Sequence, residues 1–200
     1  MRQEEWTVIY LSIHIYMLGG TFFMTVTISI ALLLLRLGLG LTIIGHGVQK
    51  LFGWFGGPGL SRVKQGFEKQ GFRPVWPWVA LAIIGEVGGG LSVALGFLTP
   101  LGAAGIFGAM AMATFKSHWK NGFWLSKGGY EYSLMLMITS VAIGLIGPGS
   151  YSLDTLFGIT LPQSLLFCVL AVAALLVVAI GIVSSRKNSA PTHENISKAS

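Results

Sequence analysis

The sequence predicts an all-α integral membrane protein with five transmembrane helices, on the basis of its composition and its long apolar runs. Of its 200 residues, 53% are hydrophobic and only 10% are charged, and the mean hydropathy is +0.73. An ordinary soluble domain carries about a quarter charged residues, and a disordered chain has low hydrophobicity. Neither class fits, so much of the apolar surface is expected to face lipid.

Turn signals divide the apolar runs into five spans, since a transmembrane helix needs about 20 mostly apolar residues. Proline is disfavoured inside a helix and is accepted in its first turn. Pro100 therefore separates the second span from the third, Pro148 ends the fourth and Pro162 opens the fifth. The predicted spans are 25–48, 76–98, 101–117, 130–147 and 162–183.

Basic residues predict the orientation, because cytoplasmic segments carry an excess of Lys and Arg. With five spans, eleven of the 13 basic residues fall on one side, only Arg2 falls on the other, and Arg36 lies inside a span. We therefore expect a multi-pass protein of the cell membrane, with its N-terminus outside and its C-terminus in the cytoplasm. The net charge of +6 is then a sign of topology, and no nucleic-acid partner is expected. The eleven are Lys50, Arg62, Lys64, Lys69, Arg73, Lys116, Lys120, Lys127, Arg186, Lys187 and Lys198.

Both terminal segments lie outside the predicted spans. Trp6–Leu18 is apolar but only 13 residues long, which is too short to cross a bilayer, and its acidic start argues against a signal peptide. Residues 1–24 are expected to lie along the outer interface, to continue the first helix upward, or to precede a true start at Met17 or Met24. Residues 186–200 are expected to form a polar cytoplasmic tail.

The single cysteine limits the redox chemistry that the chain can perform alone. Cys168 excludes an intrachain disulfide, a CxxC redox pair and a four-cysteine metal site. No HxxxH or HExxH pattern indicates a metal site either. Electron transfer would therefore need a bound cofactor, a quinone or a partner subunit.

Two charged residues lie within the predicted spans. Arg36 falls near the middle of the first span and Glu86 near the middle of the second. A charge at mid-bilayer costs about 2.5–3.5 kcal/mol on insertion scales, so such residues are paired or functional. Opposite charges at similar depth on consecutive antiparallel helices predict an ion pair. That pair either locks the two helices together or forms a polar site linked to a proton or a quinone.

Small residues predict where the helices pack closely. Gly85 with Gly89, and Ala104 with Gly108, form small-xxx-small patterns, which let helix backbones approach one another. One face of the first span is small and basic. Helical spacing of about 100° per residue places on this face Arg36, Gly40, Ile43, Gly47 and Lys50.

Further candidate site residues lie near the cytoplasmic ends of the spans. His46 and His118 suit a quinone carbonyl, a helix cap or, least favoured, the two axial positions of a b-type haem. Glu131 opens the fourth span, where the helix dipole favours a carboxylate, unless it contributes to a site. The basic and aromatic loop at 116–132 is expected at the lipid headgroups.

Three sequence blocks resemble the DoxX family of small membrane proteins. The resemblance implies a four-helix transmembrane bundle over 25–154, with residues 155–185 adding a C-terminal transmembrane helix. The blocks are LRLGLGLTIIGHGVQKLFGWFGG at 35–57, IIGEVGGGLSVALGFLTPLGA at 83–103 and GGYEYSLMLMITSVAIGLIGPGSYSLD at 128–154. The residues that match the polar pattern of the family are Arg36, His46, Lys50, Glu86, Glu131 and Asp154.

The resemblance also carries an expectation about function. Related DoxD-type proteins form the membrane subunit of thiosulfate:quinone oxidoreductase, which implies a quinone-linked redox subunit with other membrane or peripheral redox subunits as partners. Quinone would enter from lipid between spans one, two and four. In this hypothesis Arg36 and Glu86 are the catalytic pair, and the cofactor-binding residues are His46, Lys50, His118 and Glu131.

Two other functions remain open on the sequence. One is a non-catalytic accessory or scaffold subunit of a larger membrane complex. The other is a small-solute or ion conduit centred on the two intramembrane charges.

Overall fold

The computed structural model describes residues 3–189, and the environments of side chains between residues 23 and 188. This part of the chain is helical and contains no strand. The principal helices are α1 (Gln3–Phe52), α2 (Gly59–Lys69), α3 (Val75–Ile83), α4 (Gly89–Leu95), α5 (Thr99–Ala113), α6 (Glu131–Ile146), α7 (Leu153–Leu156) and α8 (Gln163–Ser189). Two π-helical turns continue these helices, η2 (Ile84–Gly88) between α3 and α4, and η3 (Thr114–His118) after α5.

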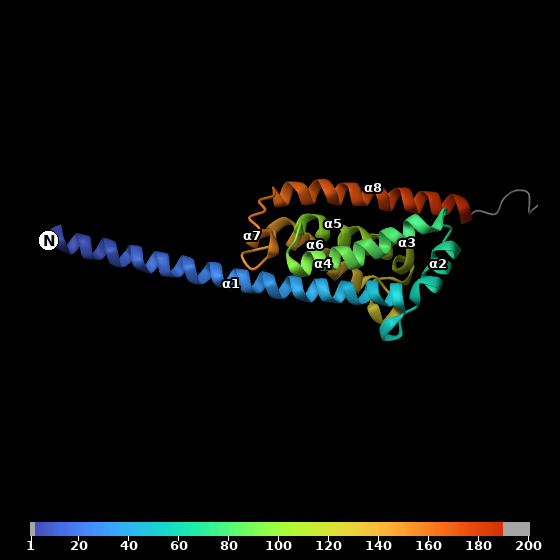
Figure 1. Ribbon diagram of the computed structural model, residues 1–200, viewed down its shortest axis with the longest axis horizontal. Helices are drawn as coiled ribbons and strands as arrows, with labels where there is room; N and C mark the ends of the chain where they lie inside the picture. Colours follow the sequence, from blue (N-terminus) through green and yellow to red (C-terminus); the bar gives the residue numbers. More distant parts are fainter. Residues whose placement is uncertain (1–2, 190–200) are drawn as a thin grey trace, which may run out of the picture.

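Four helical segments close into a bundle. The helix α1 packs against α4, α4 against α5, α5 against α6, and α6 returns to α1. The long helix α8 packs on α5 and α6 from outside this ring (Figure 1). The predicted fold, a four-helix bundle with one additional C-terminal helix, is confirmed.

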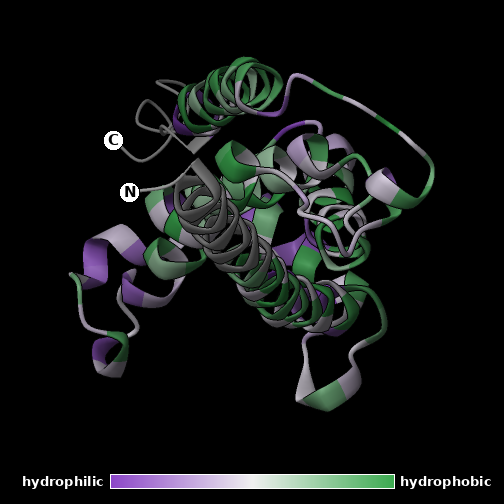
Figure 2. Ribbon diagram, turned by 90° about the vertical axis from the view of Figure 1, so that its left-hand side faces the viewer, coloured by the Kyte–Doolittle hydropathy of each residue, from purple (hydrophilic) through white to green (hydrophobic). Residues whose placement is uncertain are grey.

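Helix length and hydropathy make this a membrane protein. Among the described residues, three helices are long and apolar enough to cross a bilayer: Phe23–Phe52, Val75–Leu95 and Gln163–Asn188. The helix α5 with η3 is about 30 Å long, and α6 is a shorter apolar helix of 16 residues, about 24 Å long at 1.5 Å per residue. Figure 2 shows α8, the helix at the top, as hydrophobic along most of its length.

Helix ends follow the proline signals. Pro100 lies in the first turn of α5, after Leu98 at a backbone φ of 49°, and α8 begins directly after Pro162. The first helix continues upward from the bundle, because α1 is unbroken from Gln3 and its first part projects beyond the other helices (Figure 1). Residues 1–2, and residues 190–200 of the predicted tail, lie outside the described residues.

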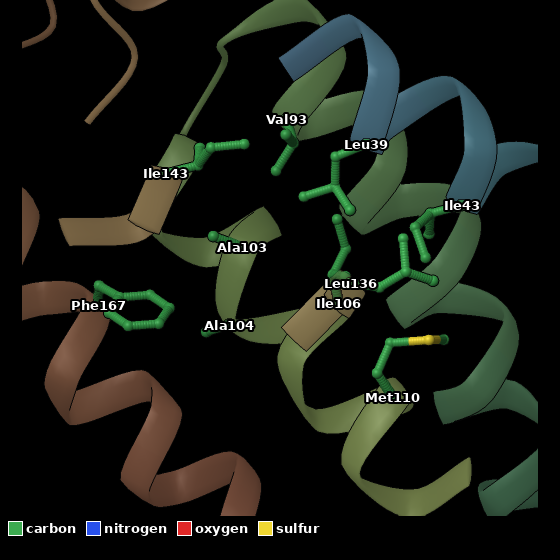
Figure 3. Packing of buried hydrophobic residues seen from close by; sticks show 10 residues of the cluster. All are labelled: Leu39, Ile43, Val93, Ala103, Ala104, Ile106, Met110, Leu136, Ile143 and Phe167. Atoms are coloured by element: carbon green, nitrogen blue, oxygen red, sulfur yellow. The ribbon is translucent and has the colours of Figure 1, made fainter. Parts of the chain in front are cut away.

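The core is centred on α5. Figure 3 shows side chains from α1, α4, α6 and α8 converging on this helix. Because α5 carries mainly small residues on its buried faces, α4, α6 and α8 can all pack closely against it. The core side chains are Leu39, Ile43, Val93, Ala103, Ala104, Ile106, Met110, Leu136, Ile143 and Phe167.

Glycines bring α1 and α4 into backbone contact, as the small face of the first span predicts. A methyl group added at Gly40 would lie 2.6 Å from the carbonyl oxygen of Gly90. The predicted pattern at Gly85 and Gly89 packs in the same way on α5, with added methyl groups 3.0 and 2.9 Å from carbonyl oxygens of that helix. The relative positions of these helices are therefore fixed by steric contact.

Candidate functional site

Glu86 is a buried acid in the second predicted span, and its partner is Lys50. The carboxylate lies in the π-helical turn η2 and is 1% exposed. The ammonium Nζ of Lys50 donates to Glu86 Oε1, and the lysine side chain is 29% exposed. The second carboxylate oxygen, Oε2, has no hydrogen-bond partner among the described residues. One oxygen of this buried carboxylate therefore accepts a hydrogen bond from a cation, while the other oxygen can still accept a hydrogen bond.

The local sequence explains why this pair forms. Lys50 follows Gly47 on the small face of α1, and Gly47 lets Glu86 and Val87 of η2 approach the backbone of α1. A π-helical turn contains one more residue than an α-helical turn and is frequent at functional sites. This turn therefore presents Glu86 toward the last turn of α1, where Lys50 can reach it.

Arg36 does not contact Glu86, so the predicted pairing is wrong. Its Nη2 donates to the carbonyl oxygen of Tyr151, and its guanidinium interacts electrostatically with Asp154. The predicted equal depth of the two charges is also wrong. Arg36 packs against Gly96, which follows Glu86 by ten residues, or about 15 Å along a helix.

Arg36 and Asp154 instead organise the opposite end of the bundle. Asp154 is 1% exposed and accepts from the backbone N–H of Leu98 at 2.8 Å and of Thr99 at 3.3 Å, which caps the start of α5. Arg36 is 0% exposed, and its Nε and Nη1 have no hydrogen-bond partner among the described residues. Gly96 has a φ of +66°, and any side chain there would overlap the guanidinium. This cluster holds the α6–α8 connection against α1 and α4.

A cavity of about 470 Å³ lies at the other end, between α2, α3, α5 and α8. Lys50 forms part of its wall and links it to Glu86. Ligand sites in proteins have volumes of about 300–1,000 Å³, with mostly apolar walls and a few placed polar groups. Its apolar lining includes Val63, Phe67, Trp78, Met112, Ala174 and Val178, and its polar lining includes Lys50, Gln70, Lys116, Ser117 and His118.

The cavity is not where the sequence placed ligand entry. It lies between spans two, three and five, under the amphipathic helix α2. A groove of about 330 Å³ does lie between spans one and four, and its lining is apolar apart from Thr139. None of the predicted site residues lines that groove.

The structure divides the four predicted cofactor residues into two groups. Lys50 and His118 line the cavity. His46 lies outside it and hydrogen-bonds the Tyr132 hydroxyl at 3.0 Å, between α1 and α6. Glu131 accepts from the backbone N–H of Leu125 at 2.9 Å and so fixes the preceding loop.

His118 has a defined tautomer in this geometry. Its Nδ1 lies 2.8 Å from the carbonyl oxygen of Gly128. A carbonyl oxygen only accepts, so Nδ1 carries the hydrogen. In the neutral ring Nε2 is therefore the hydrogen-bond acceptor that remains for a ligand.

Several lining residues were not identified from the sequence. Val63 and Phe67 come from α2, a helix that no predicted span contains, and Trp78 lies in the second predicted span but was not among the candidate site residues. Ala174 and Val178 come from α8, which the sequence predicted as a plain additional span. The amphipathic pattern of 59–69 was the available signal, since such a helix needs an apolar surface to cover.

The five-helix arrangement, with buried charges at both ends, defines the class as a polytopic all-α membrane protein. A family model described as DoxX matches residues 31–119. Residues 31–119 therefore resemble a DoxX domain, which supports membership of the DoxX family. The match spans most of the bundle, from α1 to the end of η3, and includes the first two of the three blocks that resemble this family. The comparisons with curated proteins and with solved structures gave no match.

Proposed function

We propose that this protein is a quinone-linked redox subunit of the cell membrane, with the quinone ring in the cavity beside Lys50. The observation that carries the proposal is the cavity itself. It is apolar, about 470 Å³ in volume, and has a cation and a histidine in its wall. A lipid-soluble ring with two carbonyl oxygens matches an apolar volume that has hydrogen-bonding groups at its edge.

The lining groups suit both oxidation states of such a ligand. Quinone supplies the redox chemistry, since it takes up two electrons and two protons to become a quinol. The ammonium of Lys50 can donate to a carbonyl oxygen, and Nε2 of His118 can accept from a quinol hydroxyl. The Glu86 carboxylate accepts from the Lys50 ammonium and holds it in place at the cavity wall.

The electrons are expected to come from a partner. The chain has one cysteine, and no group of three or more potential metal ligands occurs among the described residues. A peripheral or membrane subunit that oxidises a thiosulfate-type donor would supply them. The basic residues around the cavity end would attract an anionic donor, and their excess favours a cytoplasmic position for this end and for the C-terminus.

A non-catalytic accessory role is the second candidate. The first part of α1 projects beyond the bundle and offers a helix for another subunit to pack on (Figure 1). The structure does not favour a conduit along α1. Arg36 and Glu86 lie at different levels, and the close contact of Gly40 with Gly90 fills the interface between them.

Photolabelling of the purified protein with an azidoquinone tests the binding site. Peptides that contain Trp78, Met112 or His118 are expected to carry the label, and excess unmodified quinone should suppress it. Ala113→Phe fills the cavity and should abolish labelling of these peptides, because Ala113 is part of its lining. Ala179→Phe adds the same bulk to an exposed position on α8 and should leave labelling unchanged. Labelling confined to other peptides, or unaffected by Ala113→Phe, would refute the site.

The redox role needs a separate assay. Membranes that contain the protein and its partners should reduce added quinone when a sulfur donor is supplied, and His118→Ala should lower that rate. If the purified complex binds quinone but shows no rate with any donor, the accessory role is favoured.

A further inference from the structure

Three cations from different segments meet at the end of the bundle that holds the cavity. Lys116 lies in η3, Lys120 lies in the adjoining 3-10 turn η4 (Trp119–Asn121), and Arg186 lies in the last turns of α8. Both Lys120 and Arg186 are close enough to repel the charge of Lys116 electrostatically. We call these three residues the Lys116 cluster.

Lys116 is fixed in position by neutral groups. Its Nζ donates to the carbonyl oxygen of Gln70 at 3.1 Å and to the Ser185 hydroxyl at 2.7 Å, and lies 5.1 Å from the centre of the Phe72 ring. These contacts hold the ammonium where α5, α8 and the α2–α3 connection meet. None of them supplies a negative charge, so the repulsion within the cluster is not balanced there.

The acids whose side chains the structure describes are engaged elsewhere. Within the residues whose side chains are described there are four: Glu86 pairs with Lys50, and Glu68 with Lys64 at 3.5 Å, while Glu131 and Asp154 accept from backbone N–H groups of Leu125 and Leu98. No ion pair in this part of the chain involves Lys120 or Arg186, and both are exposed. No acid among residues 23–188 therefore supplies a counter-charge to the cluster, which leaves it open to an external anion.

The position of the cluster identifies where that charge comes from. It lies at the ends of two membrane helices, beside Trp119, which is 55% exposed and stacks on Tyr130. Aromatic residues of this kind mark the level of the lipid headgroups. Exposed apolar residues such as Val183 on α8 continue from the cluster toward the hydrocarbon. Basic pockets between membrane helices at this level bind anionic headgroups.

We propose that the Lys116 cluster is a binding site for the phosphate of an anionic phospholipid, with the acyl chains along α8. Lys116 also lines the cavity, so the bound headgroup lies at the edge of that cavity. The site is independent of the redox proposal, because it depends on charge and membrane level and not on a quinone.

Lipid titration of the full-length protein in detergent, followed by native mass spectrometry, tests this site. Phosphatidylglycerol is compared with phosphatidylcholine of the same acyl chains. The double variant Lys120→Ala/Arg186→Ala should bind phosphatidylglycerol about 30-fold more weakly than the parent protein, from the usual contribution of each cation near an anionic membrane. The matched control Arg62→Ala/Lys69→Ala removes two exposed cations from α2 and should keep the affinity of the parent.

Each remaining outcome overturns the assignment. Equal binding of the two lipids would show that headgroup charge is not recognised. Equal losses in the two double variants would show diffuse attraction by the whole basic surface. Displacement of bound phosphatidylglycerol by inorganic phosphate or glycerol phosphate at matched concentrations would show a site for free phosphate. Intact α-helical circular dichroism in both variants excludes misfolding as the cause.

Discussion

The pair formed by Lys50 and Glu86 predicts an asymmetric response to substitution. Lys50→Met leaves the Glu86 carboxylate without its cation at 1% exposure. Removing one partner of a buried ion pair costs about 3–5 kcal/mol, because a buried charge is left uncompensated. Glu86→Gln leaves the cation instead. The Lys50 side chain is already 29% exposed, so it can extend toward polar surroundings, and we expect the loss of a charged hydrogen bond, about 1.5–3 kcal/mol.

The assay is unfolding by SDS in mixed micelles, followed by near-ultraviolet circular dichroism. We expect Lys50→Met to lower the unfolding free energy clearly more than Glu86→Gln does. The double variant Lys50→Met/Glu86→Leu should be close to the parent protein, since apolar replacement of a buried ion pair is often neutral or stabilising. With Glu86→Leu as the second single variant, that result would give a large interaction energy in the double-mutant cycle.

Two outcomes would refute this reasoning. If Glu86→Gln lowers the unfolding free energy more than Lys50→Met does, the deeper burial of Glu86 does not determine which substitution costs more. If the effect of Lys50→Met/Glu86→Leu equals the sum of the effects of Lys50→Met and Glu86→Leu, the two side chains do not interact in the folded protein.

Two glycine comparisons test the helix contacts, again by SDS unfolding. Gly40→Ala should lower the unfolding free energy by a few kcal/mol, because the added methyl group would overlap α4. Gly38→Ala lies on the same helix, but its added methyl group meets nothing within 4 Å, so the unfolding free energy should stay the same or rise slightly. Gly96→Ala and Gly56→Ala both place alanine at positive φ, which costs about 1–2 kcal/mol. Only Gly96→Ala also displaces Arg36, so it should lower the unfolding free energy by about 1.5–3 kcal/mol more than Gly56→Ala does. Equal losses of unfolding free energy in the two variants would exclude a structural role for the Arg36 guanidinium.

The fold was predictable because its signals are local. An apolar run long enough to cross a bilayer and a proline at a helix start can both be read without knowing what packs against them. Pro100 and Pro162 therefore gave the starts of α5 and α8, and the glycine spacing on α1 gave the face that meets α4. Lys50 and His118, two of the four predicted cofactor-binding residues, both line the cavity.

The partners of the buried charges were not predictable in the same way. Whether Arg36 or Lys50 reaches Glu86 depends on how far α1 and α3–α4 are shifted along each other. The length and shape of the connection that contains α2 and the π-helical turn η2 set that shift. A mid-span position in the sequence therefore does not fix the depth of a residue relative to its neighbour.

The sequence by itself determined that this chain is a multi-helix membrane protein, because composition, hydropathy and proline positions constrain each helix separately. Only the tertiary structure decided that Lys50 pairs with Glu86, that Arg36 and Asp154 hold the opposite end, and that a cavity opens under α2. These features depend on the register between helices and on residues from α2, α3, α5 and α8, which are distant in the sequence and become neighbours only when the bundle is packed.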